Sequence, residues 1–146
     1  MKRLGLATIF LLFITLAGCG GGSSSSINGN WSATLTNPDG STALSFTATL
    51  AQSGSAVNVT NLTFTTTSSC FALGTTATAQ FTSTGTSGGV TTGTFQMTVQ
   101  SGTSNTNGTN QLTLEGTLMN NTITGSWTLS GTGAGCSGSG NFTMSD

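Results

Sequence analysis

The strongest constraint on the fold is a two-residue alternation of apolar side chains with threonine, serine, asparagine and glutamine. In a β-strand this pattern places the apolar side chains on one face and the polar ones on the other. It recurs in eight segments, whose apolar positions begin at Trp31, Leu44, Val57, Ala77, Phe95, Leu112, Ile123 and Phe142. Beyond the first 19 residues no stretch has the 3.6-residue period of an amphipathic helix. The sequence therefore predicts an all-β protein.

The composition fits this interpretation. The chain of 146 residues has 32 Thr, 20 Ser and 22 Gly, and only 3% of its residues are charged. Low charge with abundant Gly and Ser is common in disordered chains, but such chains are poor in aromatic and β-branched residues. Threonine is β-branched and suits a pleated surface. We therefore expect one folded domain whose solvent face is polar but uncharged.

Short clusters of Gly, Asn and Ser separate the alternating segments, which favours an antiparallel meander. Closure of a meander removes exposed strand edges, and an uncharged, Thr-rich edge would invite aggregation. We expect a small antiparallel up-and-down barrel of about eight strands over residues 27–146, with a two-sheet β-sandwich as the alternative. A slip in the alternation near Asn61 predicts a β-bulge.

The N-terminal segment has a different character. Lys2 and Arg3 precede an apolar stretch from Leu4 to Leu16, which is about 13 residues long and shorter than the roughly 20 that span a bilayer. The sequence Leu16-Ala17-Gly18-Cys19 follows. This arrangement resembles the lipobox signal of bacterial lipoproteins. The alternative is an ordinary cleaved signal peptide followed by an unrelated cysteine.

The resemblance implies cleavage after Gly18 and acyl chains on Cys19, which would be the partner of the membrane. Residues 1–18 would be the signal peptide, and residues 19–26 the acylated cysteine with a flexible Gly/Ser tether. The protein would be lipid-anchored in the bacterial cell envelope. Gly20 follows the cysteine where an aspartate would favour the inner membrane, so we expect the outer membrane if the bacterium is Gram-negative.

The remaining cysteines, Cys70 and Cys136, are expected to form a disulfide, because an exported protein meets an oxidising environment. A reactive thiol would need a cationic neighbour, and the predicted domain has none. In an up-and-down barrel both cysteines fall in connections at one end, together with Asn37–Ser41 and Ser101–Thr109. Tight turns at Gln52–Ser55, Gly85–Gly89 and Met119–Asn121 form the other end, where the tether would enter.

A short internal repeat, I-x-G-x-W, occurs at Ile27–Trp31 and again at Ile123–Trp127. Its G-x-W part is similar to the first strand of the lipocalin and avidin-like barrels, a resemblance that bears on the fold alone. We expect the glycine to leave room for the indole across the barrel floor. The alternative is simply two core tryptophans. Biotin binding is not carried over, because the chain has no tyrosine.

The chain lacks the side chains that most catalytic and metal sites use. It has no histidine, and its acids are Asp39, Glu115 and Asp146, of which Glu115 is expected to face solvent. A serine or threonine hydroxyl without a base is inert, and three acids with paired cysteines are too few ligands for a zinc or calcium site. We therefore expect no enzyme, cofactor or metal. Without cations in the domain we also expect no nucleic-acid partner.

These observations favour a non-catalytic binding module with its site at the membrane-distal loop end, the usual place for ligands in barrels. The candidate binding residues are Trp31, Trp127 and Asp39, and the ligand would be a small apolar molecule or a glycan end. The alternative is a structural or surface-interaction protein of the cell envelope with a solid core. Recurrent Thr-x-Thr pairs resemble those on ice-binding faces, but they show no fixed period.

Overall fold

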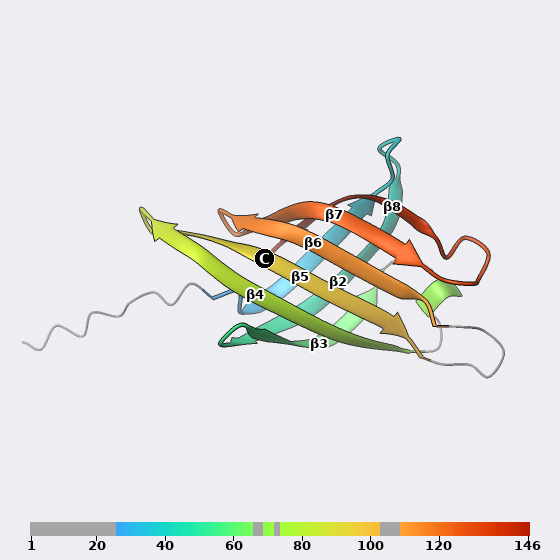
Figure 1. The fold of residues 1–146 in the computed structure, drawn as a ribbon, viewed down its shortest axis with the longest axis horizontal. Helices are drawn as coiled ribbons and strands as arrows, with labels where there is room; N and C mark the ends of the chain where they lie inside the picture. The colour runs from blue at the N-terminus through green and yellow to red at the C-terminus, as the bar shows by residue number, and fades with distance from the viewer. Residues whose placement is uncertain (1–25, 66–68, 72–73, 103–108) are drawn as a thin grey trace, which may run out of the picture.

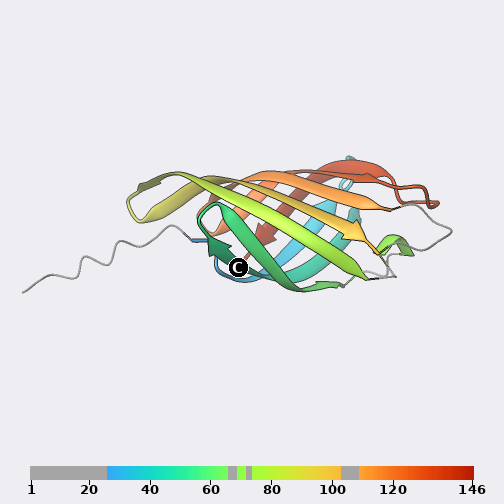
Figure 2. The same ribbon diagram turned by 60° about the horizontal axis from the view of Figure 1, so that its bottom comes forward.

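The structure is a computed structural model that describes residues 26–65, 69–71, 74–102 and 109–146. Its eight antiparallel strands follow one another around a closed barrel (Figures 1 and 2). They are β1 (Gly29–Thr36), β2 (Thr42–Ser53), β3 (Ala56–Phe64), β4 (Thr75–Ser87), β5 (Val90–Ser101), β6 (Gln111–Met119), β7 (Thr122–Ser130) and β8 (Gly138–Ser145). A 3-10 turn, η1 (Ser69–Phe71), lies between β3 and β4. The barrel is confirmed, and the sandwich alternative is not.

The lipobox, Cys19 and the tether up to residue 25 lie outside the described residues. Within the part of the chain that the structure describes, no helix has the length and apolar character needed to cross a membrane.

The barrel wall is paired unevenly. The β4–β5 ladder runs from Thr75 opposite Ser101 to Ser87 opposite Val90. Strands β3 and β4, by contrast, pair only at Ala56–Gln80 and Val57–Ala79. Phe81 extends this short seam by donating its N–H to the carbonyl of Ser55 at 2.9 Å. Among the described residues, the half of the seam nearer η1 therefore has no ladder.

The alternating apolar side chains fill the barrel interior. The largest fully buried ones are Phe46, Phe81, Phe95, Leu35, Leu50, Met97, Leu112, Leu114, Ile123 and Met144. Leu35, Phe95, Leu112 and Leu114 are 0% exposed, which leaves no space for a water molecule against them. The middle of this barrel is a packed core, as the small size of an eight-stranded barrel allows.

One end of the barrel, the tight-turn end, has two-residue hairpins. Both central residues have positive φ at Gly88–Gly89 (59° and 82°) and at Asn120–Asn121 (51° and 59°). These are the backbone angles of type I′ turns, which match the twist of the flanking strands.

The structure confirms one local prediction, the β-bulge near Asn61, and corrects another, the turn at Gly85–Gly89. The β-bulge is confirmed, because the β2–β3 register shifts beside Asn61, whose φ is 51°. The turn predicted at Gly85–Gly89 is shorter, because β4 continues to Ser87. Gly85 instead lies at a register shift between Ser83 and Gly85. A glycine inside a strand is a common mark of such a bulge.

The outer wall carries rows of hydroxyl groups. One row runs through cross-strand neighbours on six strands, Thr82, Thr94, Thr117, Thr124, Thr143 and Thr34. Ser45 continues it on β2, and its hydroxyl lies 2.7 Å from that of Thr65. Cross-strand threonine pairs stabilise neighbouring strands without charge. Because the row follows a closed, curved wall, it is not the flat array that an ice-binding face requires.

Candidate functional site

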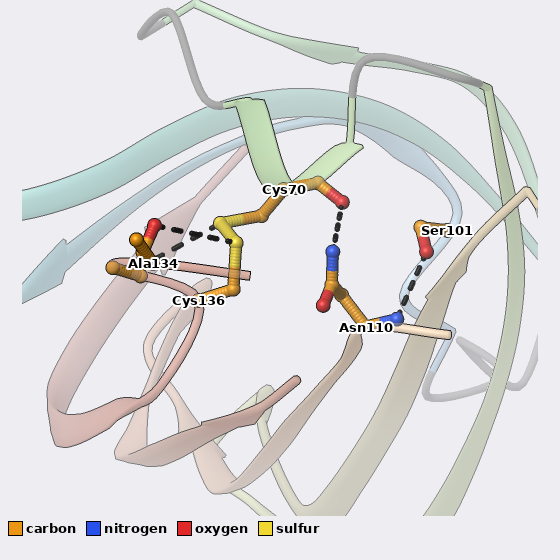
Figure 3. The surroundings of a disulfide bond; sticks show 6 residues. Cys70, Ser101, Asn110, Ala134 and Cys136 are labelled. Carbon is orange, nitrogen blue, oxygen red and sulfur yellow. Dashed lines mark hydrogen bonds between the residues drawn. A yellow bond between two sulfur atoms is a disulfide. The ribbon is translucent and has the colours of Figure 1, made fainter. Parts of the chain in front are cut away.

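The longer connections gather at the other end of the barrel, which we call the mouth. The β3–β4 and β7–β8 connections are four strands apart on the eight-strand rim, so they start from opposite sides of the mouth. The Cys70–Cys136 disulfide joins them, with the two Cα atoms 5.5 Å apart (Figure 3). The predicted disulfide is therefore present. It acts as a strap across the mouth, and both cysteines are buried.

Asn110 lies in the mouth, directly before β6. Asn110 is buried there and donates its amide Nδ2 to the carbonyl of Cys70 at 2.8 Å (Figure 3). Its backbone N–H donates to the hydroxyl of Ser101 at 2.9 Å. A Cβ atom on Gly131 would collide with the Asn110 Oδ1 atom. Asn110 is thus closely packed against η1 and Gly131 on that side of the strap.

Part of the mouth is open. A pocket of about 330 Å³, the mouth pocket, lies between the β1–β2 hairpin and the disulfide-linked connections. Its apolar wall consists of Ala43, Leu44, Trp127 and Leu129. Farther from the mouth on the same strands, Phe46 of β2 is 1% exposed and Ile123 of β7 is 0% exposed. The packed core therefore closes the inner end of the pocket.

The rim of the mouth pocket is polar. Asn37, Thr42 and Ser137 line it together with Cys70 and Gly135. Asn37 is half-buried, whereas Thr42 and Ser137 are exposed. The side-chain amide of Asn37 donates to the Ser41 hydroxyl at 3.1 Å, which orients it within the hairpin. The pocket thus combines an apolar wall with one amide and two hydroxyl groups.

Trp127 forms part of the pocket wall and is held from two sides. Its indole Nε1 donates to the carbonyl of Thr36 at 3.0 Å. Cβ atoms built on Gly138 and Gly140 would lie 3.2 Å and 2.9 Å from the indole, so the ring rests against these two glycines of β8. The expectation that Gly125 makes room for this indole is wrong. The atoms nearest Gly125 belong to the backbone of Glu115 and Gly116, and the glycine permits close approach of β6.

Trp31 lies at the tight-turn end, away from the mouth pocket. Its indole Nε1 donates to the carbonyl of Ile27 at 2.9 Å, and both side chains are buried. Gly29 also does not accommodate its indole, because the atoms nearest to it belong to the carboxyl group of Asp146. The two tryptophans of the repeat therefore close opposite ends of the core.

Asp39 lies in the turn of the β1–β2 hairpin and does not line the mouth pocket. Its Oδ1 atom accepts hydrogen bonds from the Ser41 hydroxyl at 2.6 Å and from the Ser41 N–H at 2.9 Å. These bonds hold the pKa of its carboxyl below the ordinary value of 3.8. The geometry gives Asp39 a part in shaping the hairpin that carries Asn37 and Thr42.

Acidic groups are sparse around this site. Glu115 is exposed on the outer face of β6, away from the barrel interior. Within the described ranges, no three His, Cys, Asp or Glu side chains gather closely enough to hold a metal ion.

Comparisons with family models, with curated proteins and with solved structures find no match to this chain. The site must therefore be interpreted from its own geometry.

The structure brings together some of the predicted site residues and adds others. Trp127 and Cys70 line the mouth pocket, whereas Trp31 and Asp39 do not. The sequence prediction missed Asn37, Thr42 and Ser137, which border the pocket, and Asn110, which is buried in the mouth and donates to the carbonyl of Cys70. These residues lie in connections or at the first position of a strand, where alternation does not indicate a direction. The turn signal at residues 37–41 was the only pointer to Asn37.

Proposed function

We propose that the protein is a non-catalytic binding module, anchored in the bacterial envelope through acyl chains on Cys19, whose mouth pocket takes a small ligand. The observation that carries the binding role is the asymmetry of the mouth. The disulfide strap crosses it, Asn110 is closely packed beside the strap, and an open pocket of about 330 Å³ lies by the β1–β2 hairpin. This volume is at the lower end of the range typical of ligand sites.

The position of Ile27, at the start of the barrel domain, supports an outward-facing site. Ile27 is buried at the tight-turn end, where its N–H donates to the Gln52 side chain at 3.2 Å. The eight residues from Cys19 to Ser26 reach at most about 26–29 Å when extended. A lipid anchor at Cys19 would therefore hold the tight-turn end near the membrane and direct the mouth pocket away from it.

Anchoring has its own test. Mass spectrometry of the protein purified from a bacterial envelope is expected to show a mature N-terminus at Cys19 carrying acyl chains. Cys19→Ala is expected to leave the protein unacylated. An unmodified N-terminus at another residue would contradict the anchor, while leaving the pocket unaffected.

The packed interior favours a second candidate, a structural or surface-interaction protein of the envelope. Among the described residues, seven core side chains on β1, β5, β6, β7 and β8 are 0% exposed, so the barrel can serve as a rigid body without any ligand. Under this alternative the mouth pocket would stay empty and partners would contact the outer wall.

The two tryptophans separate the candidates, because only Trp127 lines the pocket. In the Trp31→Phe variant the fluorescence reports on the mouth, and in Trp127→Phe it reports on the tight-turn end. Methyl glucoside, octanol and sodium octanoate would each be titrated into both full-length variants. A saturable change in the Trp31→Phe variant alone, abolished by the pocket-filling change Ser137→Leu, would support binding. No change with any probe would favour the structural role.

A further inference from the structure

The polar rim and shallow depth of the mouth pocket indicate what class of ligand it suits. We infer that the mouth pocket binds the terminal sugar of an uncharged glycan, and not a lipid chain or an anion. This inference rests on the proposed function and names its ligand. It depends on three properties of the pocket, which are its depth, its charge and the arrangement of its polar atoms.

The depth excludes an extended acyl chain. The apolar wall at Leu44, Trp127 and Leu129 retains 3–7% exposure. Farther from the mouth on the same strands, Phe46 of β2 is 1% exposed and Ile123 of β7 is 0% exposed. A lipid carrier needs a cavity that continues into the barrel, and here the core blocks that path. A ligand that enters must be about as short as the pocket and extend outward into solvent, as the last residue of a glycan does.

The charge excludes a preference for anions. Residues 27–146 contain no lysine or arginine, so no cation can offset a carboxylate or phosphate that leaves water. Asp39 lies in the hairpin that supplies Asn37 and Thr42 to the rim. Its negative charge opposes the approach of an anion.

The polar atoms suit a hydroxylated ligand. Asn37, Thr42 and Ser137 offer an amide and two hydroxyls. Among the residues that the structure describes, no protein group forms a hydrogen bond with the hydroxyl of Thr42 or of Ser137. Such groups both donate and accept, as sugar hydroxyls do. Leu44, Leu129 and Trp127 also line the pocket and supply an apolar surface for the C–H face of a sugar ring.

The experiment compares ligand classes on the full-length Trp31→Phe protein. The probes are the methyl glycosides of glucose, galactose, mannose and N-acetylglucosamine, the methyl glycoside of glucuronic acid, and octanol. We expect at least one neutral glycoside to bind in a saturable way and more tightly than the glucuronide. Thr42→Val and Ser137→Ala are each expected to weaken that binding about three- to tenfold. Thr124→Val, an exposed threonine of the outer wall, is the matched control and should change nothing.

The outcomes separate the ligand class from the proposed function. Tighter binding of glucuronide than of every neutral glycoside would overturn the inference, as would glycoside binding that is insensitive to both rim variants. Octanol binding reported by Trp127, with no glycoside binding, would also overturn it while leaving a binding function at the mouth. If no probe binds, both the ligand class and the binding function fail. Equal unfolding midpoints for the three threonine and serine variants would show that any loss of binding is local.

Discussion

The indole Nε1 of Trp127 on β7 donates a hydrogen bond to the carbonyl of Thr36 on β1, and the 3.0 Å bond passes across β8. Gly140 of β8 lies directly beneath, where a Cβ atom would collide with the Thr36 carbonyl oxygen. A tryptophan on one side of the closing seam is thereby tied to the strand on the other. The same indole forms part of the wall of the mouth pocket, so closure of the barrel and the shape of the pocket depend on one contact.

Gly140→Ala should therefore be strongly destabilising. The added methyl group must displace either the Thr36 carbonyl or the indole, and either shift leaves a buried N–H without its acceptor. We expect a loss of about 2–4 kcal/mol in the free energy of unfolding, measured by urea denaturation. Gly85→Ala is the matched control within a strand, because its Cβ would meet only the Thr92 hydroxyl at an ordinary 3.8 Å. Similar losses in the two variants would contradict this account of the seam.

The disulfide strap should be a major contributor to stability. It links residues 66 positions apart, and loop-closure entropy for a loop of that size corresponds to about 4 kcal/mol. The Cys70→Ala/Cys136→Ala double variant is expected to lower the unfolding free energy by up to this amount. Hydrogen exchange should show the largest change at η1 and the β7–β8 connection. An unchanged stability would mean that the packing of Phe71 on Phe64, at 4.6 Å between ring centroids, already holds η1 in place.

Asn110 is expected to be the main polar support of η1. In Asn110→Ala the buried carbonyl of Cys70 loses its amide donor, which should cost about 1–3 kcal/mol of unfolding free energy. Asn141→Ala, on the exposed face of β8, is the control and should change stability by less than about 0.5 kcal/mol. If Asn110→Ala were as stable as the unchanged protein, a water molecule would have to replace the hydrogen bond that the Asn110 amide donates to the Cys70 carbonyl.

The Asp39 carboxyl should titrate below its ordinary pKa of 3.8 because Ser41 donates to it through its hydroxyl and its backbone N–H. A pKa lowered in the folded state stabilises the fold above pH 3.8, and this contribution is lost as the pH falls through the folded pKa. In Ser41→Ala the hydroxyl donor is removed, so the pKa should rise toward 3.8. NMR titration of the carboxyl carbon measures both values, and an unchanged pKa in the variant would assign the effect to the backbone N–H alone.

The strand order, the barrel and the disulfide could be predicted because each depends on a pattern that the sequence displays. Trp31, Phe46 and Phe95 occur in alternation with polar residues, and this period assigns them to the interior without knowledge of their neighbours. The disulfide is expected because an exported protein meets an oxidising environment, and counting connections along the meander places both cysteines at one end. Such inferences need the direction of a side chain along one strand and nothing from the strands beside it.

The roles of the glycines and the pocket rim could not be predicted, because they depend on register between strands. Gly140 and Trp127 meet only because β7 and β8 pair them directly, and no local pattern states that pairing. Ser137, in the β7–β8 connection, and Thr42, at the start of β2, come together at the pocket only once the barrel has closed. The alternation of apolar and polar residues does not indicate the role of Asn110 either, because its partner Cys70 is 40 positions away in the chain.

The central claim, a ligand site at the mouth and not elsewhere on the barrel, is tested most directly by an NMR titration that resolves the two tryptophan indole N–H signals. With the tightest-binding methyl glycoside, the account predicts that the Trp127 indole signal and the amides of Asn37, Thr42 and Ser137 shift together in a saturable way. The chemical shift of the Trp31 indole N–H, at the opposite end of the core, should not change. Shifts confined to the outer wall or to the Trp31 end, or no shifts at all, would contradict the account.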